Sequence, residues 1–361
     1  HTPLHRVAVL RSPLRMLRPV ITVPAALTLA IALLVVTATP AEAFDPFDTQ
    51  ATIRTGACTP RQPAGALGLA EVVDLALCNN PQTREAWASA RVQAGLVGVA
   101  QAPYLPAING NVGSSRNRTR VEDLPETKRT LNSASLAISW LLYDFGAREA
   151  TLESARELLA AAVSTQDSTA QSVFLAALQA FFQVHAFEAA LNAAELSEKA
   201  AQESLAAAEA RYRAGNATPA DRLQAQTARS QATLTRIRVA GELRTAHGTL
   251  ANAIGLDANR PLELRPLGAV TAPPDFDRNA EALIAEARQR RPDLAAAEAQ
   301  LRAARASVDA TKAAHLPSIS LGATPSWQDN GGLTTNASSI GVSVSIPLFS
   351  GFGQTYKVRT A

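Results

Sequence analysis

The chain has few of the residues that usually carry chemistry. Its 361 residues include two cysteines, five histidines and one methionine, and only 5% are aromatic. The cysteines form no C-x-x-C element and the histidines are scattered, which argues against a metal site. No G-x-S-x-G, P-loop or H-E-x-x-H sequence occurs. We therefore predict a protein that is not an enzyme and needs no cofactor, and we interpret paired acids such as Glu195 and Glu198 as solvated helix faces.

The N-terminal residues 1–43 are predicted to be a secretory signal peptide. Arginines at positions 6, 11, 15 and 18 precede an apolar run from Ile21 to Val36, and Ala41-Glu42-Ala43 supplies a small-x-small cleavage site. A membrane anchor is the alternative, but the run falls short of about 20 apolar residues and contains Pro24. Cleavage would leave residues 44–68 as an N-terminal segment.

The net positive charge of the chain comes from the predicted signal peptide, residues 1–43. Four arginines and Glu42 give it a net charge of +3, which equals the +3 of the whole chain. The remaining protein is near neutral, so no nucleic-acid partner is expected.

The two cysteines, Cys58 and Cys78, are predicted to form a disulfide. An exported protein meets an oxidising compartment, where closing a loop of about 20 residues is worth about 3 kcal/mol. Two buried free thiols are the alternative.

A single very long helix is predicted between Gly146 and Gly215, because residues 147–214 contain neither glycine nor proline. At 1.5 Å per residue it would be about 100 Å long. Apolar residues recur at heptad spacing, as in a coiled coil, at Leu152, Leu159, Val173, Ala180, Phe187 and Ala194. The alternative is two helices with a break at Ser164–Thr169.

A tight polar turn, RYRAGNATPAD, follows this helix. Gly215 suits a left-handed C-terminal cap, and Thr218 can cap a second helix that begins at Pro219 and continues to about Ile254. The negative charge of Asp221 in the first turn interacts favourably with the helix dipole, and this role does not depend on the protein's function. The pair is predicted to be a long helical hairpin.

Two segments alternate strictly between bulky apolar and small residues, which predicts β-strands. The apolar positions are Ala134, Leu136, Ile138, Trp140 and Leu142 in one segment and Ile340, Val342, Val344 and Ile346 in the other. A soluble sandwich could show this pattern, but a membrane barrel shows it with valine or isoleucine facing lipid and serine facing the lumen. Weaker strands are predicted upstream, from Ile108 and from Ile319.

The layout of the chain occurs twice. The segments beginning at Asn80 and Arg291 align without a gap at a constant offset of about 211 residues, including Pro81 with Pro292 and the Leu-Pro-x-Ile ending. Aromatic residues and glycine follow each predicted hairpin. We predict a first repeat at 69–254, a linker at 255–276 and an incomplete second repeat at 277–361. Four strands cannot close a barrel, since about eight are needed, so several chains must pool their strands.

These features resemble the TolC-type outer membrane efflux family. The resemblance extends from about Leu69 to Phe352 and rests on ALCNNPQTREAW, YLPAING, LLYDFGAREA, RYRAGNATPADRLQAQ, the segment from Arg291 to Leu321, and PLFSGFG. It implies a mixed fold with four transmembrane β-strands per protomer and a long α-helical coiled-coil tunnel. It also implies a homotrimer in the outer membrane that is docked by a periplasmic adaptor and an inner-membrane transporter.

The resemblance also assigns candidate sites. Gly215 and Asp221 match the glycine and aspartate of the family's periplasmic tip, where the aspartate helps to hold the tunnel closed; Arg213, Asn216, Ala217 and Thr218 lie beside them. Outer-membrane lipid would contact Leu136, Ile138, Trp140, Ile340, Val342 and Val344. The chain begins with His1 and stops shortly after the second aromatic-glycine junction, which suggests a fragment without the second tip.

The expected function is the exit duct of a tripartite export machine. The ALCNNPQTR segment with its upstream cysteine resembles members that serve type I secretion of proteins, including toxins. Small-molecule efflux and a periplasmic scaffold or adaptor are the alternatives.

Overall fold

The computed structural model describes residues 45–53, 59–63, 65–120, 122, 125–260, 262–268 and 280–361. The chain divides into two units, His1–Pro46 and Phe47–Ala361. Only the last two residues of the first unit are described, and the predicted signal peptide therefore lies outside the described residues. The second unit contains helices and one antiparallel sheet.

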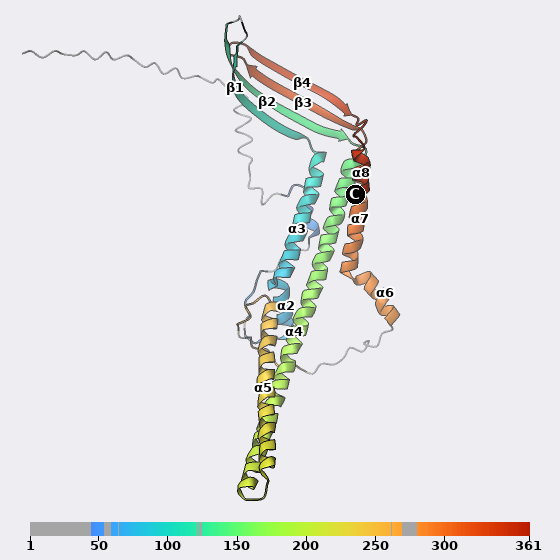
Figure 1. The fold of residues 1–361 in the computed structure, drawn as a ribbon. Coiled ribbons are helices and arrows are strands. Elements are labelled where there is room, and N and C mark those ends of the chain that lie inside the picture. Colours follow the sequence, from blue (N-terminus) through green and yellow to red (C-terminus); the bar gives the residue numbers. More distant parts are fainter. Residues whose placement is uncertain are drawn as a thin grey trace, which may run out of the picture. The chain divides into compact units, whose positions relative to one another are not determined.

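The elements of the second unit follow the predicted duplication (Figure 1). In chain order they are η1 (Thr49–Thr52), α2 (Leu69–Asn79), α3 (Pro81–Gln101), η2 (Ala102–Tyr104), β1 (Ala107–Thr119), β2 (Thr127–Tyr143), α4 (Ala147–Arg213), α5 (Pro219–Ala253), α6 (Ala280–Arg290), α7 (Pro292–Ala313), β3 (Ser318–Asp329), β4 (Thr334–Ser345) and α8 (Gly353–Thr360). The bounds of α2 and α6, like the first residues of α3 and α7, differ by 211. The structure therefore confirms the internal repeat.

Helix α4 is unbroken over 67 residues, so the two-helix alternative is wrong. In the doubtful stretch, the hydroxyls of Thr165 and Thr169 donate to the carbonyls of Ala161 and Thr165, at 2.8 and 2.9 Å. These side chains therefore bond along the helix instead of competing with it. By length and composition α4 could also cross a membrane, but most of its length packs against other helices.

The heptad residues predicted from the sequence form the inner side of α4. Leu152, Leu159, Val173, Ala180 and Ala194 are buried, and Phe187 packs against the core as a partly buried residue. Around Leu152 and Leu159, α3 supplies Ala90, Ala94 and Val97. Because two of these partners are alanines that are fully buried, the two helices approach closely.

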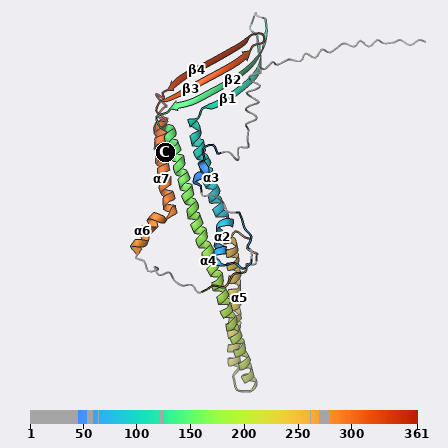
Figure 2. The ribbon, with the colours of Figure 1, turned by 180° about the vertical axis from the view of Figure 1, so that it is seen from behind.

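A second core lies farther along α4, where α2 and α5 meet it. Phe181 and Val184 of α4 pack with Val72 of α2 and with Leu250 and Ile254 at the end of α5. Figures 1 and 2 show α4 beside α3 and α7 over the half near the sheet, and beside α5 over the other half. The same helix thus belongs to two successive cores.

Gly255 fixes the end of α5 against α2. Its φ is +70°, and a Cβ there would lie 2.6 Å from the carbonyl oxygen of Asn79. The amide of Leu256 donates to the carbonyl of Ala251 at 2.8 Å, which closes the helix end. Only glycine allows both the left-handed turn and this approach.

The sheet contains all four predicted strands in the order β1-β2-β3-β4. Each hairpin pairs within itself, and β2 joins β3, from the other repeat, with Ile138 opposite Ala323 and Trp140 opposite Leu321. A bulge between Leu141 and Tyr143 ends the strict alternation of β2. Strands β1 and β4 are the open edges, so the sheet of one chain is not closed.

Candidate functional site

The turn between α4 and α5, which we call the tip, brings together the residues predicted from the sequence. Gly215 has a φ of +73°; its amide donates to the carbonyl of Tyr212 at 3.0 Å, and the amide of Asn216 donates to that of Arg211 at 2.9 Å. This pair of hydrogen bonds is the Schellman motif, which confirms the predicted left-handed cap. Arg213, Gly215, Asn216 and Thr218 are exposed and Ala217 is half-buried.

Asp221 forms a reciprocal capping box with Thr218. The amide and the hydroxyl of Thr218 donate to one carboxylate oxygen of Asp221, at 2.9 and 2.8 Å, and the Asp221 amide donates to the Thr218 hydroxyl at 3.3 Å. These hydrogen bonds, from the amide first, hold the pKa of Asp221 below its usual value of 3.8. Within one chain the carboxylate is thus ionised and acts as a helix cap.

Two tip residues were missed by sequence reasoning. The guanidinium of Arg222 lies 4.8 Å from the centre of the Tyr212 ring, so this cation–π pair joins the last turn of α4 to the first turn of α5. An aromatic and a basic residue ten positions apart give no signal until the turn folds back.

The interpretation of Glu198 as part of a solvated helix face is wrong. The Glu198 carboxylate accepts a hydrogen bond from Thr233 at 2.6 Å and pairs with Arg236 at 2.5 Å, both on α5. The Thr233 hydroxyl and then Arg236 lower its pKa. Glu195, by contrast, is exposed as expected. Glu198 therefore ties the two arms of the helical hairpin together.

The four strands place their bulky apolar residues on one face of the sheet. Paired residues share a face, and the register aligns Ile108 with Ile138, Ile138 with Ala323, and Ala323 with Ile340. Of the predicted lipid-facing residues, Ile138, Trp140, Ile340, Val342 and Val344 are 37–79% exposed, and Leu136 is half-buried on the same face.

The opposite face carries small and hydroxylated residues. Ser320 lies opposite Ser343, with 2.8 Å between their hydroxyl oxygens, and Gly322 lies opposite Gly341. A sheet with one exposed apolar face and one small polar face is what a lipid-facing wall around a polar lumen requires.

The aromatic residues predicted at the ends of the hairpins form ring pairs. Tyr143 and Phe145 have ring centroids 4.7 Å apart, and Phe349 and Phe352 have centroids 5.5 Å apart. Phe145 and Phe352 both have positive φ, at 53° and 62°, so each repeat turns from strand to helix in the same conformation.

Arg148 joins the sheet to the helices, and the sequence did not single it out. Its guanidinium donates to the carbonyls of Leu141 at 2.7 Å and Leu142 at 3.1 Å, pairs with Asp144 at 3.1 Å and lies 4.7 Å from the Tyr104 ring centre. The side chains of Arg148 and Asp144 are 14% and 12% exposed. Only the folded chain brings these groups together, and they fix the angle at which α4 leaves β2.

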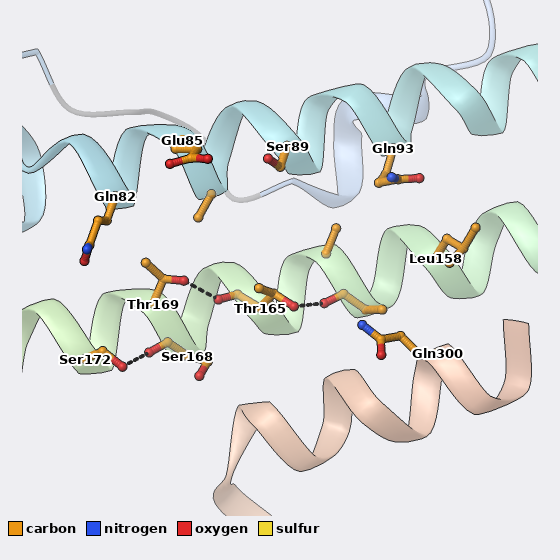
Figure 3. A pocket seen from close by; sticks show the side chains of 13 residues that line it. Gln82, Glu85, Ser89, Gln93, Leu158, Thr165, Ser168, Thr169, Ser172 and Gln300 are labelled. Carbon is orange, nitrogen blue, oxygen red and sulfur yellow. Dashed lines mark hydrogen bonds between the residues drawn. The ribbon is translucent and has the colours of Figure 1, made fainter.

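A polar pocket of about 610 Å³ lies between α3, α4 and α7 (Figure 3). Its labelled lining is mainly amides and hydroxyls, including Gln93, Thr165, Thr169, Ser172 and Gln300. The hydroxyls of Thr165, Thr169 and Ser172 donate to carbonyls of α4 itself, as the dashed bonds show. Within the described part of the chain, no group of three or more metal-ligating side chains occurs.

The predicted disulfide cannot be placed, because Cys58 lies outside the described residues. Cys78 is buried in α2. The pairing stays a prediction.

Comparison with known proteins agrees with this arrangement. The family described as outer membrane efflux protein matches residues 72–256 and 283–361. Protein CyaE of Bordetella pertussis is 32% identical over 300 residues, which cover 82% of this chain and 63% of that protein. The pyoverdine export outer membrane protein OpmQ of Pseudomonas aeruginosa is 28% identical over 298 residues, covering 79% and 62%. The chain thus spans less than two thirds of the length of these relatives.

The fold is also that of solved outer-membrane channels. The crystal structure of the Campylobacter jejuni CmeC outer membrane channel matches with a TM-score of 0.72 at 19% identity, covering 81% of this chain and 64% of that one. The predicted fold class, membrane strands combined with a long helical tunnel, is confirmed.

Proposed function

Because the chain belongs to the outer membrane efflux protein family, whose members lie in the outer membrane and extend into the periplasm, we propose that it forms the passive exit duct of a tripartite export machine. One observation carries the proposal. A sheet with an exposed apolar face and a polar opposite face continues directly into a helical hairpin whose longer arm, α4, measures about 100 Å. The part in the membrane and the part in the periplasm are thus one continuous structure, and transport rather than catalysis is its activity.

The open sheet edges support a homotrimer. Strands β1 and β4 each leave one row of backbone donors and acceptors unpaired within the chain, which is very costly in lipid. Pairing β1 of one copy with β4 of the next would satisfy both edges. Three copies would give a closed barrel of twelve strands, above the minimum of about eight.

The tip supports docking at the far end of the hairpin. Arg213, Gly215, Asn216 and Thr218 are exposed at a turn held rigid by a Schellman motif and a capping box. A rigid exposed turn loses little entropy on binding. We propose that this turn contacts a periplasmic adaptor, and through it an inner-membrane transporter. The family match favours the duct over the alternative of a periplasmic scaffold.

The cargo we propose is a protein, as in type I secretion. The support is the resemblance of ALCNNPQTR, residues 76–84, to members that export proteins such as toxins. In the structure Asn80 of this motif caps α3 and its amide nitrogen donates to the Ala253 carbonyl at 3.0 Å, so the motif braces the hairpin. Small-molecule efflux is the second candidate, and pyoverdine export is named for the relative OpmQ.

Deletion of the gene in the source bacterium tests the function. A duct for protein cargo predicts that one or a few secreted proteins disappear from the medium and return on complementation, while sensitivity to dyes and antibiotics stays unchanged. Increased sensitivity with an unchanged set of secreted proteins would instead support small-molecule efflux. If neither changed and the protein were extracted from cells without detergent, the duct would be refuted.

A further inference from the structure

The apolar face of the sheet continues into a cluster of basic side chains at the β1–β2 hairpin. The register pairs Arg116 with Thr130 and Arg118 with Lys128. Because side chains two residues apart share a face, Arg116 and Arg118 lie on the same face as Ile108 and Val112. Figure 1 shows this hairpin at the end of the sheet away from α3 and α4. We call the three residues Arg116, Arg118 and Lys128 the basic cluster.

One carboxylate holds the cluster in place without neutralising it. Arg118 lies 2.5 Å and Lys128 3.2 Å from the carboxylate of Glu126, which also pairs with Arg120 at 3.2 Å. The Arg118 and Lys128 side chains are still 62% and 57% exposed, and Arg116 is exposed as well. Several donors therefore remain directed toward solvent.

The charges are also ordered along the hairpin. Moving away from the apolar rows, Arg116 comes first, then Arg118 with Lys128, and only then Glu126, followed by Glu122 in the loop. On the neighbouring strand β3, Asp329 lies opposite Asn132, which pairs with Ser114, so this carboxylate is on the same face and one step nearer to the apolar rows than Arg116. The three cations of the basic cluster thus lie nearer to the apolar rows than Glu126 and Glu122 of the same hairpin do.

The height of the basic cluster above the apolar rows matches the level of the lipid head groups. Arg116 follows Val112 by four residues, about 13 Å along a strand and about 10 Å in height at a tilt of about 40°. The polar head-group layer on each side of the hydrocarbon core is about 5–8 Å thick. A long arginine side chain can reach back over that interval to the head groups.

We propose that the basic cluster binds the phosphates of anionic lipid head groups in the outer leaflet. The inference rests on the proposed function, because it requires the apolar face to lie in the membrane. Two guanidiniums and one ammonium on one face match phosphate oxygens, which arginine binds through paired N–H donors. The interaction would anchor the hairpin at the membrane surface and select anionic lipid around the duct.

A lipid-selection experiment tests the proposal. The full-length protein is placed in bilayer discs of phosphatidylcholine with 20% phosphatidylglycerol, and the lipids that remain bound after detergent release are counted by native mass spectrometry. We expect phosphatidylglycerol to be enriched in the wild type. The triple variant Arg116→Gln, Arg118→Gln, Lys128→Gln should lower the ratio of bound phosphatidylglycerol to bound phosphatidylcholine at least tenfold, since each surface cation near anionic lipid contributes about fivefold.

Arg129 provides a matched control. It lies on the same hairpin opposite Asn117, and with Asn117 and Thr119 it lines a hollow on the other face of the sheet. Arg129→Gln should leave the enrichment unchanged. Equal enrichment in the wild type and the triple variant, or an equal loss in Arg129→Gln, would overturn the proposal.

Two further measurements keep the result interpretable. Glu126→Gln removes the counter-charge and should increase the enrichment, which a merely unfolded hairpin would not do; no increase would count against the proposal. Inorganic phosphate at 50 mM should leave the enrichment intact, and complete displacement would indicate a site for free phosphate instead. Failure of the wild type to enter pure phosphatidylcholine discs would refute the proposed function, whereas entry without lipid preference would refute only this inference.

Discussion

Val344 offers the sharpest test that the sheet lies in a membrane. It lies near the end of β4 in an apolar row, between Val342 and Ile346, which follows the last strand residue, and it is 57% exposed in the single chain. Val344→Arg would place a guanidinium among lipid tails. Near the bilayer midplane such a change costs about 2–4 kcal/mol, which is about a 30- to 900-fold change in the unfolding equilibrium constant.

Two positions on the same strand supply the comparison. Ser343 is on the opposite face, where its hydroxyl lies 2.8 Å from that of Ser320, so Ser343→Arg should cost only about the 0.5–1.5 kcal/mol of one hydrogen bond. Asn336 shares the face of Val344 but lies eight residues away, about 27 Å along the strand and about 20 Å in height. Asn336→Arg lies outside the apolar band and should cost about 0–1 kcal/mol.

The assay is reversible urea unfolding of the protein reconstituted in phosphatidylcholine vesicles, followed by tryptophan fluorescence. If the apolar face lies in lipid, Val344→Arg is the most costly of the three changes. Equal costs at Val344 and Ser343 would indicate a soluble sheet with two wet faces. An Asn336→Arg change as costly as Val344→Arg would show that the apolar band is longer than the register indicates.

The remaining predictions concern the parts of the chain outside the sheet. Gly215→Val should lower the free energy of unfolding by about 1–2 kcal/mol, because φ at Gly215 is +73°. It should also abolish export while the trimer stays in the membrane. Gly241→Ala, in open space inside α5, should instead stabilise the protein by about 0.5–1 kcal/mol in thermal unfolding. Asp221→Ala should raise the closed-state conductance in planar bilayers, and an unchanged conductance would leave only the capping role. Since the folded-state pKa of Asp221 is depressed, its stabilising effect is present above the usual value near 3.8 and disappears as the pH falls through the lowered pKa; Asp221→Asn should flatten that acid limb in thermal scans. Unreduced mass spectrometry should show Cys58 linked to Cys78, and free thiols on both would disprove the bond.

Local patterns in the sequence were sufficient for the elements and the repeat. The absence of glycine and proline from residues 147–214 predicted α4 as one rod, and Gly215 with Thr218 predicted the turn after it. Period-two alternation predicted β2 and β4. The offset of about 211 residues predicted that these two strands occupy equivalent places in two repeats. These features depend on residues that are close together in the sequence, so they can be predicted from the sequence alone.

Contacts between distant segments were decided only by the tertiary structure. The pairing of β2 with β3 could not be predicted from the sequence, because backbone hydrogen bonds between strands do not depend on which side chains the residues carry. This pairing places the apolar rows of both repeats on one face. Glu198 looked like a solvated acid until α5 brought Arg236 to it. No sequence pattern marks Arg148, because it donates to carbonyls of two separate elements, that of Pro103 in η2 and that of Leu141 in β2. The basic cluster became visible only through the register of β1 with β2, since charge along the chain does not say which face it occupies.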